Sequence, residues 1–376
     1  MPPVTFLIKP ASSACNMTCS YCFYCAIAEN RESFSTGMMR PETLETLVRK
    51  GLAYADDYCC FAFQGGEPTL AGLPFFEKLI ELQKQYNTKN VRIQNCIQTN
   101  AYAIDDDWAA FLAKNDFLIG VSLDGPREIH DLNRRDRTGS GTFARVMKSI
   151  RTLERHRAQF NILSVVTGNS ARHIRKIYQF YKKSGFSYLQ FIPCLEPLED
   201  ERGSTRTYLS PDDYAAYLCT LFDLWYEDYI NGRYISIRHI DNYIHLLMGH
   251  APEACSMRGV CSVQLVVEGD GSVYPCDFYA YDEWRLGSIL TDDVASLLTG
   301  DAAEAFLAPS RAVPEKCRAC AYAPLCRNGC RRDRVLQDGI LTNYYCEAYR
   351  RFFAHAAPRM EQVARMILAG RAPGAK

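Results

Sequence analysis

The sequence predicts an α/β fold with a parallel sheet, followed by a smaller cysteine-rich domain. Strand-like and helix-like segments alternate six times within about the first 200 residues, as is typical of strand–helix units that form parallel sheets. The strand candidates are continuous apolar runs without alternation, as expected of buried strands in a parallel sheet. From Cys255 to Cys346 the composition changes, with eight cysteines in 92 residues. A barrel-like arrangement and an open, doubly wound sheet both fit this pattern.

Six apolar runs are the expected strands. They are Val4–Lys9, Cys59–Phe63, Val91–Ile97, Phe117–Leu123, Phe160–Val166 and Tyr188–Pro193. A cysteine loop follows the first run, a glycine-rich segment at 64–68 follows the second, and Gln98–Asn100 follows the third. Because active sites of barrel-like α/β folds assemble at the carboxyl ends of the strands, these segments should share one site.

Helical periodicity separates the strands. The expected helices are Pro41–Ala53, Pro74–Tyr86, Asp105–Lys114, Thr142–His156, Ala171–Ser184 and Pro211–Tyr229. Pro41 suits a first helical turn, and the acidic start of the third helix suits the helix dipole. Near the C-terminus, an Asp-Gly turn at 269–271 predicts a hairpin between 264–268 and 272–274. The final segment, Pro358–Leu368, should be an amphipathic helix.

Composition narrows the class of protein. The 376 residues carry no net formal charge, which gives no indication of binding to nucleic acid or to an anionic membrane. No apolar run approaches the ~20 residues that span a bilayer, and the N-terminus lacks a signal-peptide pattern. We therefore expect a cytoplasmic protein. In a reducing compartment, 17 cysteines indicate metal binding rather than a disulfide framework.

The segment Cys15–Cys22 dominates the chemistry. Cys15, Cys19 and Cys22 have C-x3-C-x2-C spacing, and three such thiolates can hold three irons of a [4Fe–4S] cluster while one iron stays open. A zinc knuckle or a reactive thiol cluster is the alternative interpretation. The motif, with Tyr21 before its third cysteine, resembles the radical S-adenosylmethionine (radical SAM) superfamily. The resemblance implies that the open iron binds S-adenosyl-L-methionine and that the fold is a partial (β/α)6, TIM-like barrel.

The second set of cysteines provides eight further thiols. Eight thiols can complete two four-iron clusters, or two structural zinc sites. Their spacing resembles the SPASM domain, an auxiliary-cluster module, and this implies three [4Fe–4S] clusters in all. The resemblance implies that one auxiliary cluster is held by Cys255, Cys261, Cys276 and Cys330. It implies that the other is held by Cys317, Cys320, Cys326 and Cys346. The expected domains are a radical SAM barrel at 1–235, a SPASM domain at 236–350 and a C-terminal helix at 351–376.

A closer resemblance is to the anaerobic sulfatase-maturating enzymes. It is carried by Ile8–Pro10, Cys22–Tyr24, Gln64–Thr69 and Tyr274–Tyr279, and it extends over essentially the whole chain. These enzymes oxidise a cysteine or serine in a sulfatase to Cα-formylglycine. The resemblance implies that Asp277, next to Cys276, is the base for the thiol or hydroxyl proton, since a positioned carboxylate can accept one. The alternative for Asp277 is an ordinary turn residue.

The resemblance also implies contacts with S-adenosylmethionine. Gly66 would present its backbone to the methionyl amino group, because glycine permits close approach. Arg134 would pair with the methionyl carboxylate, although Arg135 is equally suited by charge. The remaining expected contacts come from Ser122, Tyr21 and Leu195. Tyr24 and Gln64 are weaker candidates for the substrate side, where packing roles are equally compatible. The remaining cysteines are interpreted as core residues, with Cys25 left open.

Two other functions fit parts of this pattern. A maturase that forms thioether or carbon–carbon crosslinks in a ribosomal peptide precursor would share both cluster domains. The Cys276–Asp277 pair, and the lack of an evident peptide-recognition domain before residue 4, favour formylglycine formation. A non-catalytic metal scaffold is the third candidate. The expected partners are an unfolded sulfatase polypeptide and a reduced flavodoxin or ferredoxin-type donor. The sequence does not separate cysteine-type from serine-type substrates.

Overall fold

The computed structural model describes residues 3–205, 207–337 and 339–371. The chain forms two compact units, each of which is discontinuous in the sequence. The first unit comprises Met1–Leu123, His130–Phe160 and Val263–Phe306. The second comprises Asp124–Ile129, Asn161–Ser262 and Leu307–Lys376.

Four parallel strands form the centre of the first unit. In sheet order they are β1 (Val4–Ile8), β2 (Tyr58–Phe63), β3 (Arg92–Thr99) and β4 (Leu118–Ser122). On the other edge of β1 lie β8 (Val266–Val267), β9 (Ser272–Tyr274) and β10 (Gly287–Ser288). The pairing of β1 with β8 is parallel, and the next two pairings are antiparallel. The expected hairpin therefore adds to the edge of the main sheet.

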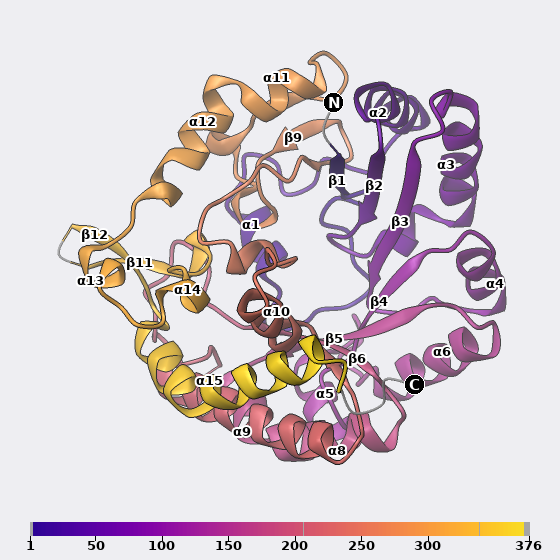
Figure 1. Cartoon of the computed structure of the whole chain (residues 1–376). Helices are drawn as coiled ribbons and strands as arrows, with labels where there is room; N and C mark the ends of the chain where they lie inside the picture. Colours follow the sequence, from indigo (N-terminus) through magenta and orange to yellow (C-terminus); the bar gives the residue numbers. More distant parts are fainter. Residues whose placement is uncertain (1–2, 206, 338, 372–376) are drawn as a thin grey trace. The chain divides into compact units, whose positions relative to one another are not determined.

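Helices cover the strands of the first unit on their outer side (Figure 1). They are α2 (Pro41–Tyr54), α3 (Leu73–Tyr86), α4 (Asp106–Lys114) and α6 (Phe143–Arg155). The strands are buried because their apolar runs pack against these helices, and Phe6 and Phe61 are fully buried. Asp105 caps α4, since its carboxylate accepts a hydrogen bond of 3.0 Å from the Trp108 N–H. Four shorter helices complete the unit: α1 (Phe23–Glu29), α5 (Arg127–Asn133, which extends into the second unit), α11 (Val294–Thr299) and α12 (Asp301–Leu307).

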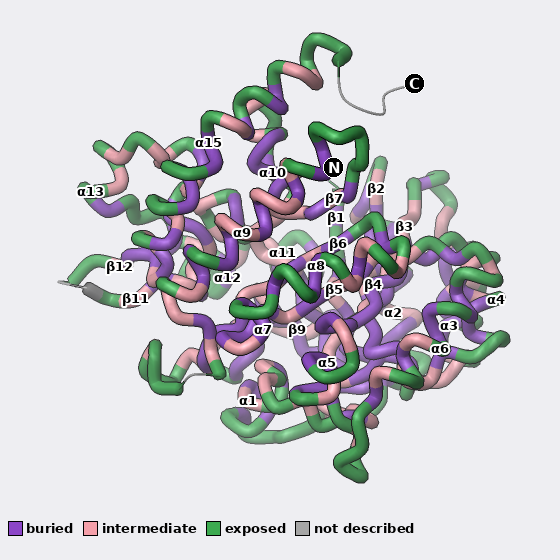
Figure 2. The backbone as a smooth tube through the Cα atoms, turned by 90° about the horizontal axis from the view of Figure 1, so that it is seen from below, coloured by how far each residue is buried: buried purple, intermediate pink, exposed green. Residues whose placement is uncertain are grey.

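The second unit contains β5 (Phe160–Val166), β6 (Tyr188–Pro193) and β7 (Ser236–Ile237), which pair in parallel. Its longest helices, α9 (Pro211–Ile230) and α15 (Cys346–Leu368), bury large side chains including Trp225, Phe352 and Met360. The backbone tube in Figure 2 shows buried strands, with the exposed residues concentrated on loops and outer helix faces. The remaining elements are α7 (Gly168–Arg172), α8 (Ile174–Lys183), α10 (Arg238–Leu247), α13 (Glu315–Arg318), α14 (Ala323–Cys326), β11 (Arg334–Gln337) and β12 (Ile340–Asn343).

Two helix predictions differ from the structure. The helix expected at Ala171–Ser184 is two helices, because Thr167 and Ser170 form a capping box that starts α7 earlier and His173 interrupts the helix. The final helix begins at Cys346 rather than at Pro358, which lies inside α15. Proline is most common in the first turn of a helix, and Pro358 is an exception. The buried face of α15 stabilises the helix on both sides of Pro358.

Candidate active site

The cysteine loop connects β1 to α1 in the first unit. Along it, Cys15 and Cys19 are half-buried and Cys22 is exposed, and none of the three is in a disulfide bond. The loop is fixed at Cys15, whose carbonyl accepts a hydrogen bond of 2.9 Å from Arg137 Nε. The Glu67 N–H donates to the carbonyl of Ala14 at 2.8 Å. The loop therefore presents three thiols from a backbone that the neighbouring segments hold in place.

These thiols are a suitable donor set for an iron–sulfur cluster. Burial, with smaller contributions from the charges of Glu67, Cys19 and Cys22, raises the pKa of Cys15 to about 12, so the thiols act on one another electrostatically. Among the described residues, no three or more His, Cys, Asp or Glu side chains gather closely enough to hold one metal ion. In a four-iron cluster the cysteines need not converge on one metal ion, since each iron takes its own thiolate. Three thiolates from this loop fit a cluster with one open iron.

The glycine-rich turn after β2 packs against the cysteine loop. Gly66 has φ +51°, and a Cβ atom at this position would lie 2.3 Å from the carbonyl oxygen of Ala14 and 2.6 Å from that of Ser12. Only glycine fits at this distance from backbone atoms. The backbone of Gly66 is therefore held directly beside the cysteine loop, where the predicted contact with the methionyl group requires it.

Glu67 connects the carboxyl ends of β2 and β3. Its buried carboxylate accepts hydrogen bonds from the Thr99 hydroxyl at 2.7 Å and from the Asn100 N–H at 2.8 Å. Asn100 Nδ2 in turn donates to Asn16 Oδ1 at 2.8 Å. Burial raises the pKa of Glu67, while these hydrogen bonds oppose the shift. The ends of three successive strands are thus joined around the cysteine loop.

Arg134 and Arg135 differ in burial and in the contacts of their side chains. Arg134 is buried, its Nη1 lies 3.9 Å from Cys19 Sγ, and its guanidinium carbon lies 5.4 Å from the centroid of the Tyr21 ring. Arg135 is exposed and donates to the Gly139 carbonyl at 3.1 Å. Ser122, at the end of β4, accepts a hydrogen bond of 3.1 Å from Gln98 Nε2. Of the two guanidinium groups, that of Arg134 lies beside a cysteine of the loop.

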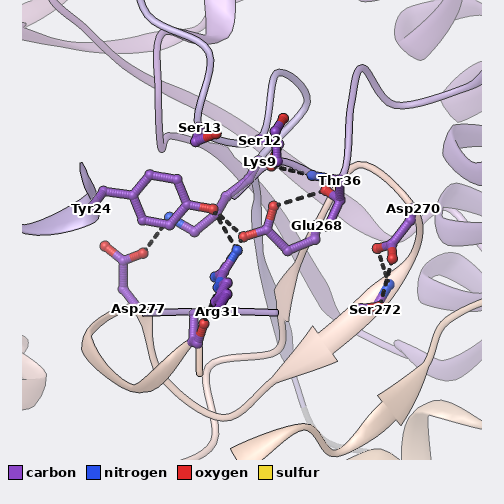
Figure 3. Close-up of polar contacts among 12 residues, drawn as sticks. Lys9, Ser12, Ser13, Tyr24, Arg31, Thr36, Glu268, Asp270, Ser272 and Asp277 are labelled. Atoms are coloured by element: carbon purple, nitrogen blue, oxygen red, sulfur yellow. Dashed lines mark hydrogen bonds and ion pairs between the residues drawn. The ribbon is translucent and has the colours of Figure 1, made fainter. Parts of the chain in front are cut away.

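Asp277 lies just after β9, with both carboxylate oxygens engaged. Oδ1 is 2.5 Å from Lys9 Nζ, and Oδ2 accepts a hydrogen bond of 2.5 Å from Gln64 Nε2. Lys9 is fully buried at the end of β1, and Figure 3 shows its side chain directed at Asp277. A positive charge and an amide N–H group therefore both contact this carboxylate.

A second buried carboxylate, Glu268, lies next to this pair (Figure 3). It accepts hydrogen bonds from the Tyr24 hydroxyl and, at 3.0 Å, from Arg31 Nη2. The Tyr24 ring lies over the Lys9 ammonium, 3.8 Å from Nζ to the ring centroid. Burial, and next the charge of Glu268, raises the pKa of Tyr24 well above its usual value, so its hydroxyl keeps its proton. Tyr24 thus contacts both charged pairs.

Sequence reasoning missed Lys9, Arg31 and Glu268. A lysine at the end of a buried apolar strand was a visible signal, because lysine is almost never fully buried without a partner. Arg31 and Glu268 gave no local signal, since their positions in the chain are 237 residues apart.

Comparison with known proteins identifies the family. The radical SAM superfamily matches residues 10–181, and the iron–sulfur cluster-binding SPASM domain matches residues 255–321. A cysteine-type anaerobic sulfatase-maturating enzyme of Clostridium perfringens is 48% identical over 369 residues, which cover 98% of this chain and 100% of the relative. The chain belongs to the anaerobic sulfatase-maturating enzymes.

Two further matches agree with this assignment. A serine-type anaerobic sulfatase-maturating enzyme of Bacteroides thetaiotaomicron is 30% identical over 99% of this chain and 94% of the relative. The solved structure of native anSMEcpe with bound AdoMet and Cp18Cys peptide has a TM-score of 0.93 at 48% identity. That match covers 97% of this chain and 100% of that one. The predicted fold class, a radical SAM partial barrel with a C-terminal SPASM domain, is confirmed.

The enzyme class and the cofactors are confirmed as well. The chain is a radical SAM sulfatase-maturating enzyme, which uses a [4Fe–4S] cluster and S-adenosylmethionine, and its SPASM domain binds additional iron–sulfur clusters. The residues predicted to hold these groups, and the exact domain boundaries, stay predictions. Among the described residues, the sulfatase-maturating enzyme has no helix with the length and apolar character needed to cross a membrane.

Most of the auxiliary cysteines of this sulfatase-maturating enzyme lie in the second unit. Cys276 belongs to the first unit, and the other seven belong to the second. All eight are half-buried, and none of them is in a disulfide bond. Cys326 ends α14 and Cys346 begins α15, so helix ends carry two of them. Leu195, the predicted backbone contact for S-adenosylmethionine, is buried in the second unit, where its carbonyl accepts from Arg332 at 3.2 Å.

The remaining cysteines divide by burial. Cys59, Cys60 and Cys194 are buried, as expected of core residues, and Cys96 and Cys219 are half-buried. Cys25 is exposed on α1, so it is not a core residue. The buried face of α1 is formed by Tyr24, Ile27 and Ala28, and Cys25 lies outside that face.

Proposed function

We propose that this enzyme oxidises a cysteine in the nascent active site of a sulfatase to Cα-formylglycine, with cysteine rather than serine as its substrate residue. Support for the residue type comes from the relatives. Those named as cysteine-type are 45–48% identical to this chain, whereas the serine-type relative of Bacteroides thetaiotaomicron is 30% identical. The observation that carries the proposal is the Asp277 carboxylate, buried and held by Lys9 and Gln64.

The cysteine loop would hold the cluster that starts the reaction. Cys15, Cys19 and Cys22 are the proposed ligands, leaving one iron for S-adenosylmethionine. When bound, the two groups supply a 5′-deoxyadenosyl radical that removes one hydrogen atom from Cβ of the target residue. The half-buried position of Cys15 and Cys19 would limit the access of water to the cluster.

Residues around the loop would orient S-adenosylmethionine. The backbone of Gly66 is the proposed contact for the methionyl amino group, and the Arg134 guanidinium is the proposed partner of its carboxylate. A planar guanidinium matches a carboxylate in shape and charge. Ser122, Tyr21 and Leu195 are the other proposed contacts. Arg134 is favoured over Arg135 because it faces the cysteine loop.

Asp277 would accept the proton of the substrate thiol. In this step the S–H bond breaks, an O–H bond forms on Asp277, and the electron pair stays on sulfur. Loss of the Cβ hydrogen atom, this proton and one further electron gives a thioaldehyde, which water converts to the aldehyde and hydrogen sulfide. The clusters held by the second cysteine set would accept that electron. Gln64 contacts Asp277, the proposed base, whereas the Tyr24 hydroxyl contacts Glu268. We therefore propose Gln64 as the better candidate to face the substrate.

Anaerobic incubation with two matched peptides tests the proposal. The peptides carry a sulfatase motif and differ only in cysteine or serine at the target position. Reconstituted, reduced enzyme and S-adenosylmethionine should lower the mass of the cysteine peptide by about 18 units, as sulfur is replaced by oxygen and two hydrogens are lost. Formation of 5′-deoxyadenosine should accompany this change, and the serine peptide should react more slowly.

Other results would contradict parts of the proposal. Equal or faster conversion of the serine peptide would overturn the substrate preference alone. 5′-Deoxyadenosine formed without any change in either peptide would overturn the sulfatase substrate and favour another peptide, such as a crosslinked ribosomal precursor. A reduced flavodoxin or ferredoxin is the proposed electron donor, in the cytoplasm, and should replace a chemical reductant in the same assay.

A further inference from the structure

Arg334 is a buried cation at the start of β11 in the second unit. Its side chain ends among backbone carbonyls. Nη1 donates to the Ser310 carbonyl at 2.9 Å, and Nε donates to the Asn328 carbonyl at 3.2 Å. Nη2 donates to the carbonyls of Gly259 at 2.6 Å and Gly329 at 3.1 Å. One side chain thus joins three segments that are distant in the sequence.

These segments carry cysteines from both predicted auxiliary ligand sets. Gly259 lies between Cys255 and Cys261, which belong to one set. Asn328 and Gly329 lie between Cys326 of the other set and Cys330 of the first. Ser310 completes the arrangement, because its hydroxyl accepts a hydrogen bond of 2.9 Å from the Cys261 N–H.

The loop before Cys330 has an unusual backbone that Arg334 stabilises. Arg327, Asn328 and Gly329 all have positive φ, at 51°, 61° and 56°. Successive residues in the left-handed region are costly unless the surroundings hold them. Two of these three carbonyls accept hydrogen bonds from Arg334, and Asn343 Nδ2 donates to the carbonyl of Asn328 at 3.3 Å. Arg334 therefore contributes directly to the conformation that places Cys330.

The charge of Arg334 acts on the same cysteines. Its guanidinium interacts electrostatically with the thiols of Cys261, Cys330 and Cys317, and with Asp333. Burial lowers the pKa of Arg334, yet a guanidinium stays protonated in proteins. The four carbonyls that it binds are neutral, so its positive charge acts on the cysteines and on Asp333. A nearby cation favours the more reduced, more negative state of an iron–sulfur centre, whose potential depends on local charge and hydrogen bonding.

We infer that Arg334 is a positioning residue for the auxiliary iron–sulfur centres: it holds the cysteine loops of both ligand sets and raises the reduction potential of the centres bound there. This inference rests on the proposed ligand sets. It assigns to one side chain both a mechanical and an electrostatic role. The two roles predict different results for Arg334→Lys, which keeps the charge but loses the planar fork, and for Arg334→Gln, which loses the charge.

The experiment measures iron content and midpoint potentials by redox titration with electron paramagnetic resonance. All variants are full-length, reconstituted protein in which Cys15, Cys19 and Cys22 are replaced by alanine, so that only auxiliary centres report. Arg202→Gln is the matched control. Arg202 is a half-buried arginine that also donates to carbonyls, those of Glu196 and Arg332, and it lies 3.7 Å from the Glu196 carboxylate. Its charge interacts with Arg332, Glu196 and Asp333.

We expect Arg334→Gln to bind less iron and to shift the midpoint potential of the remaining auxiliary centres to more negative values. Arg334→Lys should bind less iron, but its midpoint potential should stay close to that of the protein with Arg334 intact. Arg202→Gln should keep the midpoint. If Arg334→Gln binds no iron, the electrostatic role is tested with Arg334→Lys. A midpoint potential of Arg334→Lys clearly more negative than that of the protein with Arg334 intact would overturn this role.

Two further results separate this inference from the proposed ligands. Unchanged iron content and unchanged midpoints in Arg334→Gln would overturn the inference completely. If the protein with Arg334 intact binds far fewer than the about eight irons that two four-iron clusters require, the ligand sets are wrong instead. The same shift in Arg202→Gln and Arg334→Gln would show a general effect of buried charge and would also overturn the inference.

Discussion

Lys9 and Asp277 form a buried ion pair, with 2.5 Å between Nζ and Oδ1. Their positions in the chain are far apart, yet β8 lies directly beside β1, and the hairpin that it forms with β9 ends just before Asp277. The Lys9 side chain passes Gly65, where a Cβ atom would lie 2.5 Å from Nζ and 2.7 Å from Cγ. The path of the lysine to its partner thus depends on a glycine of the turn after β2.

Replacing Asp277 with asparagine should slow formylglycine formation about 10²- to 10⁴-fold, the range typical of losing a general base. Asparagine keeps the shape of the side chain but cannot accept the thiol proton. Mass spectrometry of the peptide and chromatography of 5′-deoxyadenosine should show that cleavage of S-adenosylmethionine continues. An unchanged rate of aldehyde formation would exclude Asp277 as the base.

Replacing Lys9 with methionine should lower both the rate and the stability. Breaking a buried ion pair by removing one partner costs about 3–5 kcal/mol, because the other charge stays buried. Urea unfolding of reconstituted protein measures this cost, and the double variant Lys9→Met, Asp277→Asn should recover part of it. Lys182→Met is the control, since Lys182 lies 2.5 Å from Asp228 in a more exposed pair. An equal loss of stability in both single variants would argue against a special role for burial.

Replacing Gly66 with alanine should displace the cysteine loop, because the new Cβ would collide with the carbonyls of Ala14 and Ser12. We expect weaker S-adenosylmethionine binding and lower iron content, measured by equilibrium dialysis and iron analysis. Gly37→Ala is the matched control: Gly37 also has positive φ, 80°, but has open space around its Cβ position. An equal loss of S-adenosylmethionine binding in both variants would mean that backbone strain, rather than the collision, explains the effect.

His239 should make the protein less stable in acid. Burial lowers its pKa to about 4, below the value of 6.5 for an unhindered histidine, so the folded state keeps it neutral. Below pH 6.5 the unfolded state binds the extra proton, and stability falls as the pH decreases. Between pH 7 and pH 5 this loss amounts to about 2 kcal/mol at most.

The measurement is urea unfolding at both pH values. Between pH 7 and pH 5, the free energy of unfolding should decrease less in His239→Gln than in the unsubstituted protein. In His250→Gln, at an exposed position, it should decrease as much as in the unsubstituted protein. A decrease of the same size in all three proteins would mean that His239 does not contribute to the acid sensitivity.

Much of the fold and part of the site were predictable because their signals are local. The spacing of Cys15, Cys19 and Cys22 indicates a cluster by itself, since the ligands come from one short loop. The strands of the first unit appear as apolar runs because they are buried beneath the helices on their outer side. Helix ends were less certain: Pro358 resembles a helix start, yet packing of α15 carries the helix through it.

The sequence by itself determined the alternation of strands and helices, the two cysteine sets and the family resemblance. Only the tertiary structure decided which charges meet: Lys9 with Asp277, and Arg31 with Glu268 across 237 positions of the chain. It also decided that Arg134, rather than Arg135, faces the cysteine loop. The physical reason is that ligand spacing and periodicity act over a few residues. A buried ion pair depends on which strands become neighbours and on the space that their side chains leave.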